Sequence, residues 1–228
     1  MKSISIYLLV VLLPLFSFGQ QIPDYDKNLT VIRDTTIYNA QVKKSSANHL
    51  VEIIDIVPSI KLDIRYATTN NFTGKIVYNS PKAYVRQPVA EALAIVQKSL
   101  NKHGLGLIIF DAYRPYSATV KFYEIYKDTN FVASPWKGSR HNRGAAVDVS
   151  LINLETGEEL QMPTPFDDFT DVAHPEYKNL PENVLNNREI LIDVMQNHGF
   201  RVYPYEWWHF DFIGWEAYDL MDIPFEEL

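Results

Sequence analysis

The segment from residue 139 to residue 151 reads Ser-Arg-His-Asn-Arg-Gly-Ala-Ala-Val-Asp-Val-Ser-Leu. Its second half, residues 145–151, predicts a strand, because apolar side chains alternate with small or polar ones. Val147 and Val149 face one side of that strand, and Asp148 faces the other side among small neighbours. A strand with one small, polar face is typical of the wall of a cleft. The segment therefore predicts a sheet that carries a site on one face.

Asp148 lies at the centre of this strand, in a stretch with almost no other charge. Burying an unpaired carboxylate costs on the order of several kcal/mol, so Asp148 needs a strong partner. A divalent cation would serve, with His141 as a second ligand. A salt bridge to Arg140 or Arg143 would serve as well, and the local sequence favours neither alternative.

A second candidate segment is Tyr205-Glu206-Trp207-Trp208-His209. A catalytic zinc uses three protein ligands and leaves one position for water, while a nearby carboxylate outside the ligand set takes the proton of that water. His209 and Glu206 fit these two roles only if the chain bends between them, since residues three apart on a regular strand face opposite sides. The alternative is an aromatic core strand with a glutamate at its edge. The chain has no cysteine, so any metal must be held by nitrogen and oxygen ligands.

A third segment, Phe110-Asp111-Ala112-Tyr113-Arg114-Pro115, follows a buried apolar run. Arg114 then lies at a strand end, where an arginine can hold a carboxylate or stabilise a developing oxyanion. The alternative is a structural ion pair between Arg114 and Asp111.

Working outward, apolar spacing predicts a single α+β domain with a mainly antiparallel sheet flanked by helices. Hairpin-length links between the predicted strands favour the antiparallel arrangement. Helices are expected at 88–104, 116–126 and 189–198, and strands at 60–64, 107–110, 145–151, 201–203 and 208–212.

The first 20 residues have the features of a secretory signal peptide: Lys2, an apolar run over residues 4–18, and small residues near a cleavage point. That run is shorter than the roughly 20 residues that span a bilayer, so we expect cleavage, no stable membrane span, and a periplasmic or secreted protein. Residues 21–50 are weakly patterned and are interpreted as an N-terminal extension with one strand near Val31 or Tyr38. The formal charge of −7 and the lack of a basic run argue against a nucleic-acid partner. The oligomeric state is not predicted.

Taken together, these segments resemble the D-alanyl-D-alanine dipeptidase family, which are zinc peptidases related to the D,D-carboxypeptidases and to the hedgehog signalling domain. The pattern Ser-x-His-x-x-Gly-x-Ala-x-Asp matches residues 139–148, and Glu-x-Trp-His matches residues 206–209. Residues 65–74 and 111–115 are similar to two further segments of that family. The resemblance covers about residues 51–215, and the zinc D,D-dipeptidase domain is expected to occupy residues 51–228.

The resemblance implies one Zn²⁺ per chain and a role for each matching residue. Its ligands would be His141, Asp148 and His209. Glu206 would be the general base, and Arg114 would stabilise the tetrahedral intermediate. Contacts with the substrate would come from three residues: Ser139 beside the metal, and Tyr66 and Asp167 at the free amino end.

The function implied by the resemblance is hydrolysis of the D-Ala-D-Ala dipeptide into two D-alanines, in a role related to the cell wall. The alternative within the same chemistry is a D,D- or L,D-carboxypeptidase that trims peptidoglycan stem peptides. A metal-bearing binding module without activity is a third possibility, and the presence of Glu206 argues against it. A structural domain with buried His–Asp pairs and no metal is the fourth.

Overall fold

The computed structural model describes residues 24–228 and is built around a five-stranded sheet with strand order β3-β5-β6-β8-β7. β3 pairs with β5 in parallel, and the other three pairings are antiparallel. This confirms the predicted α+β domain with a mainly antiparallel sheet. The strands, in spatial order, are β3 (Lys61–Leu62), β5 (Leu105–Asp111), β6 (Ala146–Asn153), β8 (Glu206–Phe212) and β7 (Phe200–Tyr203).

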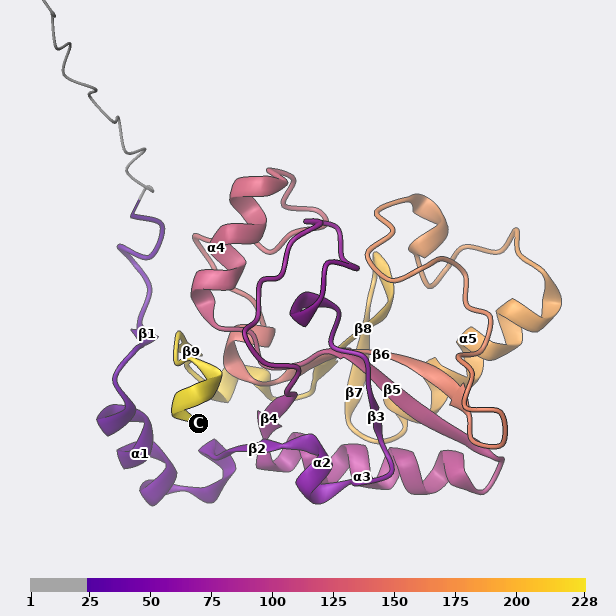
Figure 1. Ribbon diagram of the computed structural model, residues 1–228, viewed down its shortest axis with the longest axis horizontal. Coiled ribbons are helices and arrows are strands. Elements are labelled where there is room, and N and C mark those ends of the chain that lie inside the picture. The colour runs from indigo at the N-terminus through magenta and orange to yellow at the C-terminus, as the bar shows by residue number, and fades with distance from the viewer. Residues whose placement is uncertain (1–23) are drawn as a thin grey trace, which may run out of the picture.

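Two long helices pack against this sheet. α3 (Gln87–Asn101) packs on β5 and α5 (Glu182–Gln196) packs on β7, while α4 (Tyr116–Ile125) lies on the other side of the sheet from α3 in Figure 1. Pro88 occupies the first turn of α3, where backbone N–H groups have no partner within the helix, so proline costs no hydrogen bond there. α5 begins at Glu182 rather than at the predicted residue 189, because its first turn carries polar side chains that give no apolar period.

The N-terminal part of the described chain packs against the C-terminal part. β1 (Val31–Ile32) pairs in parallel with β9 (Leu220–Met221), and β2 (Leu50–Glu52) pairs antiparallel with β4 (Tyr84–Arg86). The predicted strand near Val31 is therefore present, whereas Tyr38 lies in α1 (Thr35–Lys44), which the Asp34 side chain caps. A short helix, α2 (Ile53–Ile56), follows β2.

Single-turn 3₁₀ helices complete the fold. They are η1 (Ser46–Asn48), η2 (Arg65–Ala67), η3 (His141–Arg143), η4 (Asp171–Ala173), η5 (Trp215–Ala217) and η6 (Phe225–Glu227).

The predicted signal peptide at residues 1–20 lies outside the described residues. Among residues 24–228, no helix is both long and apolar enough to cross a membrane. The boundary predicted between an extension at 21–50 and a domain at 51–228 stays a prediction.

Candidate metal centre and active site

Three carboxylate or imidazole side chains lie in register across three neighbouring strands. Asp111 on β5 is paired with Asp148 on β6, and Asp148 is paired with His209 on β8. The ladder between β5 and β6 shifts register between Ile109 and Asp111, directly beside this row. A bulge bends its strand and changes the direction in which side chains point, and bulges are common next to active sites.

His141 reaches the same place from η3, outside the sheet. The Arg114 N–H donates to the His141 carbonyl (3.1 Å), and the His141 N–H donates to the Ser139 hydroxyl (3.1 Å). Gly144 then closes η3 in the left-handed region at φ 67°, where a Cβ would come within 2.5 Å of a Leu50 methyl. The glycine in the predicted motif is therefore required by the turn that presents His141.

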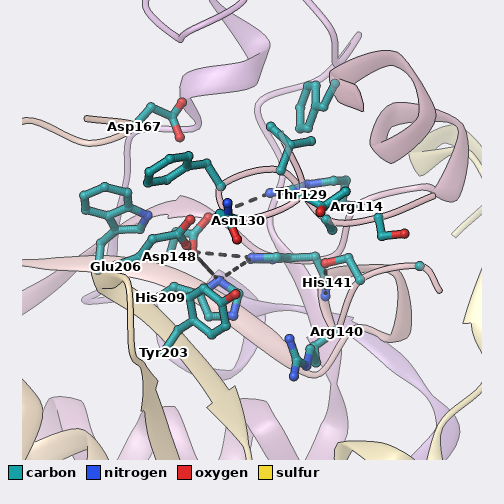
Figure 2. A pocket seen from close by; sticks show the side chains of 18 of the residues that line it. Arg114, Thr129, Asn130, Arg140, His141, Asp148, Asp167, Tyr203, Glu206 and His209 are labelled. Carbon is teal, nitrogen blue, oxygen red and sulfur yellow. Dashed lines mark hydrogen bonds and ion pairs between the residues drawn. The ribbon is translucent and has the colours of Figure 1, made fainter. Parts of the chain in front are cut away.

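His141, Asp148 and His209 converge on one point, with one potential ligand atom from each lying within 4.8 Å of the others. His141 Nε2 is 3.1 Å from His209 Nδ1, which lies 3.0 Å from Asp148 Oδ1. Figure 2 shows the three side chains pointing toward one another at the floor of a pocket. Their chemistry fits a tetrahedral zinc site with one position left for water.

The hydrogen bonds on the far sides of the rings fix which nitrogens face this point. His141 Nδ1 is 2.7 Å from the Ala112 carbonyl, and His209 Nε2 is 2.9 Å from the Asp211 carboxylate. Both partners are acceptors, so each ring carries its proton on that side and turns a lone pair inward. Asp148 Oδ1 is buried and lacks a hydrogen-bond partner. A proton or a cation between these electron pairs relieves their mutual repulsion, and three ligand atoms directed at one point suit a metal ion.

The pKa shifts of Asp148 and His209 agree with a positive charge at this point. Burial acts to raise the pKa of Asp148, but attraction by His141 and His209 outweighs it and holds that pKa well below its usual range. Burial acts to lower the pKa of His209, yet the Asp211 and Asp148 carboxylates raise it to about 10. The surroundings are therefore built for positive charge, and a proton and a metal ion compete for the same lone pair.

Glu206 lies beside the ligands because β8 is irregular where the sequence requires a bend. Tyr203 pairs with Glu206 while Val202 pairs with Phe210, so extra residues of β8 bulge out between these two pairs. Glu206 Oε2 consequently comes within 3.7 Å of His209 Nδ1. The pKa of Glu206 is raised to about 8, mainly by burial and further by the nearby Asp148 and Asp167 carboxylates, although His209 acts to lower it. The bend that the sequence requires between Glu206 and His209 is therefore present, and the role of Glu206 as a base stays a prediction.

Arg114 forms the ion pair with Asp111 and also lies beside the proposed ligands, and its role toward a developing oxyanion stays a prediction. Its Nε and Nη2 donate to Asp111 Oδ2 at 3.0 and 2.7 Å, which is the structural ion pair. Its Nη2 also lies 3.9 Å from Asp148 Oδ2, so the guanidinium borders the ligand cluster. The other alternative for Asp148, a salt bridge to Arg140 or Arg143, is wrong. Arg140 points to Asp211 instead, and Arg143 donates to the Tyr218 carbonyl.

The predicted substrate-binding residues line the same cavity of about 450 Å³ as the ligands, Arg114 and Glu206. The Tyr66 hydroxyl lies 3.1 Å from both carboxylate oxygens of Asp167. Asp167 adopts a left-handed backbone at φ 63°, which a non-glycine residue rarely takes and which strained functional sites often contain. Burial, together with the nearby Asp148 carboxylate, raises the pKa of Asp167 to about 7. Ser139 lines the cavity next to η3.

Several residues that support the site were not predicted from the sequence. Asp211 holds His209, the Ala112 carbonyl holds His141, and Asn142 bonds the Ser139 N–H (2.7 Å) and the Arg114 carbonyl (2.8 Å). The contact of Asp211 with His209 could have been predicted, since residues two apart on a strand face the same side. The roles of Ala112 and Asn142 depend on long-range packing and had none.

A mixed sheet and the adjacent η3 together bring two imidazoles, a carboxylate and a further buried carboxyl group to one cavity, which is the arrangement of a single-metal peptidase. Residues 46–225 match the peptidase M15 family model described as D-ala-D-ala dipeptidase. The chain belongs to this family of zinc metallopeptidases.

Two relatives and one solved structure illustrate the similarity. A D-alanyl-D-alanine dipeptidase of Escherichia coli (strain K12) is 32% identical over 177 residues, covering 78% of this chain and 91% of the relative. One from Enterococcus faecium is 31% identical over 176 residues, covering 68% and 87%. A structure of VanYB in complex with D-alanine-D-alanine aligns with a TM-score of 0.41 at 16% identity, covering 60% of this chain and 76% of that one.

Proposed function

We propose that this protein hydrolyses the D-Ala-D-Ala dipeptide to two D-alanines, with one Zn²⁺ per chain held by His141, Asp148 and His209. Family membership over residues 46–225 supports the reaction class, and relatives named for this dipeptide support the substrate. The observation that carries the mechanism is the bulge in β8, which brings the Glu206 carboxyl to 3.7 Å from a ligand nitrogen.

Zinc bound at these ligands would polarise the scissile carbonyl and acidify a water molecule. Glu206 is the general base that accepts the proton of this water and then delivers it to the leaving amine. Arg114 lies on the opposite side of Asp148 from Glu206 in Figure 2 and donates to the oxygen that gains negative charge. Asp111 holds the guanidinium in place, so little reorganisation is needed when that charge develops.

The free amino group of the dipeptide binds Asp167, which Tyr66 orients. Burial makes the Asp167 carboxylate unfavourable by itself and raises its pKa, so an ammonium ion is the partner that stabilises the charged form. A substrate with an acylated amine would leave both Asp167 and its own amide without a partner. This accounts for a preference for free dipeptides over peptidoglycan stem peptides.

A dipeptide panel that varies chirality at each position, with and without a chelator, tests the proposal. The expected result is the highest kcat/KM for D-Ala-D-Ala, loss of activity on chelation, recovery with Zn²⁺, and close to one zinc per chain by elemental analysis. Release of D-alanine from a stem pentapeptide at a rate above that for the free dipeptide would instead establish the carboxypeptidase alternative. Unchanged activity in a metal-free preparation would overturn the zinc mechanism.

We also propose that the protein is exported and works in the periplasm or outside the cell. The apolar run over residues 4–18 behind Lys2 supports this. N-terminal sequencing of protein recovered from fractionated cells tests it. A start near residue 21 is expected, and an intact Met1 in the cytoplasmic fraction would contradict export.

A further inference from the structure

The cavity has an acidic end and a basic end. Figure 2 shows Asp167 and Arg140 on opposite sides of the three proposed ligands. Arg143 and Lys137 line the same cavity near Arg140 in sequence. A dipeptide carries an ammonium at one end and a carboxylate at the other, so this polarity gives a bound dipeptide a direction.

Arg140 is held in place by aromatic rings rather than by hydrogen bonds. Its guanidinium carbon lies 5.1 Å from the centre of the Trp215 ring and 5.9 Å from that of Tyr203. Stacking restricts a guanidinium to one plane and leaves its N–H edges available to a ligand. The side chain is 39% exposed, so a molecule in the cavity can reach it.

The hydrogen-bonding capacity of Arg140 is largely unused. Within residues 24–228 its guanidinium makes an ion pair with Asp211 at 3.6 Å, which is too long for a hydrogen bond, and donates to no other group. Arg140 faces Oδ2 of Asp211, while the other oxygen, Oδ1, accepts the His209 N–H at 2.9 Å.

The other arginines of the cavity differ in this respect. Arg114 donates twice to Asp111, and Arg143 donates to the Tyr218 carbonyl. Arg140 is therefore the arginine whose planar N–H edge suits the two oxygens of a carboxylate.

We infer that Arg140 forms a subsite for the C-terminal α-carboxylate of the substrate. The inference rests on the proposed function and adds a specificity-determining residue to it. With the ammonium at Asp167 and the carboxylate at Arg140, the peptide bond of a dipeptide lies between them, over the ligands and Glu206. A chain that continues beyond the second residue would place an amide where Arg140 requires a carboxylate.

The test compares D-Ala-D-Ala with its C-terminal amide in the zinc-loaded wild type and in Arg140→Gln and Arg140→Lys. The quantity of interest is the ratio of kcat/KM for the acid to that for the amide. In the wild type the acid is expected to be favoured roughly 10- to 100-fold, the range for a charge-assisted hydrogen-bonded pair. In Arg140→Gln this ratio falls to within about threefold of unity, mainly through KM. Arg140→Lys recovers part of it.

Two controls separate this role from an indirect one. Lys137→Gln removes the same charge from the same cavity and is expected to leave the ratio near the wild-type value. Calorimetric binding of the acid and the amide to zinc-loaded Glu206→Gln, with and without Arg140→Gln, repeats the comparison without turnover. Zinc content is measured for every variant, because Arg140 contacts the Asp211 carboxylate behind His209.

The outcomes are distinguishable. No hydrolysis of any dipeptide by the wild type would refute the proposed function itself. Hydrolysis with an acid-to-amide ratio that Arg140→Gln leaves unchanged would refute the carboxylate subsite alone. Equal losses on both substrates would show that Arg140 acts only on the architecture of the site, and this too would overturn the inference.

Discussion

Replacing Asp211 with asparagine should weaken zinc binding without unfolding the protein. Asp211 Oδ1 accepts the His209 Nε2–H at 2.9 Å, which turns the Nδ1 lone pair toward Asp148 and His141. Asparagine keeps the size and one acceptor oxygen but loses the charge that makes the imidazole a stronger ligand. Loss of such an outer partner lowers metal affinity by about 10- to 100-fold, or roughly 1.4–2.7 kcal/mol.

The assay is competition for Zn²⁺ against a chromophoric chelator of known affinity, at fixed pH and salt. The matched control is Asp193→Asn, which makes the same change on the exposed side of α5, outside the cavity. Its zinc affinity should stay within about twofold of the wild type. If Asp211→Asn binds zinc as tightly as Asp193→Asn, with Tm unchanged in both, the reasoning about the orientation of His209 is wrong.

The same geometry gives five further predictions. Glu206→Gln should retain zinc and lower kcat by about 10²- to 10⁴-fold. In the wild type, kcat/KM should rise with pH as Glu206 loses its proton. The inflection should lie below the pKa of about 8 that Glu206 has without a metal, because a bound cation lowers that pKa. A value of kcat/KM that falls through this pH range would contradict the role of Glu206 as base. Asp167→Asn should raise KM for D-Ala-D-Ala by roughly 10- to 100-fold with little change in zinc content, and an unchanged KM would remove Asp167 from the amine site. Asp111→Ala leaves Arg114 buried without its main partner and should lower the free energy of unfolding by about 3–5 kcal/mol in denaturant titrations. Gly144→Ala, which places a Cβ at φ 67°, should lower the free energy of unfolding by about 1–3 kcal/mol in the same titrations. Gly157 also has a positive φ but open space around it, so Gly157→Ala measures the cost of the backbone conformation without a steric clash.

The sheet could be predicted from the sequence because its strands carry their own periodicity. The strand at 145–151 and the helix that begins at Pro88 were recognisable from apolar spacing and agree with β6 and α3. The start of α5 was not recognisable, because residues 182–188 are mostly polar and form a helix that only tertiary contacts reveal. Parallel pairing of β1 with β9 joins residues nearly the whole chain apart, and no local pattern encodes it.

The ligand set was only partly predictable from local chemistry. Asp148 alone did not distinguish a metal from a salt bridge, and the structure shows why neither nearby arginine pairs with it. Arg140 precedes His141 and Arg143 follows it at the end of η3, and both guanidinium groups lie over the Trp215 ring. The bend between Glu206 and His209 was predicted as a requirement, but its form, a bulge against β7, depends on the register of another strand.

The pairing of β1 with β9 also bears on the order in which the active site forms during synthesis. Gly138, next to the start of the metal-binding motif, packs against Leu220, and the buried Arg86 guanidinium bonds both the Arg143 carbonyl and the Met221 sulfur. A ribosome makes the metal-binding loop more than 70 residues before it makes β9, given synthesis at roughly 5–20 residues per second. A nascent chain thus carries His141 and Asp148 some seconds before the segment that supports their loop exists, whereas His209 is made only shortly before β9. Products that end after His209 but before Leu220 should accordingly contain every proposed ligand and still bind zinc poorly.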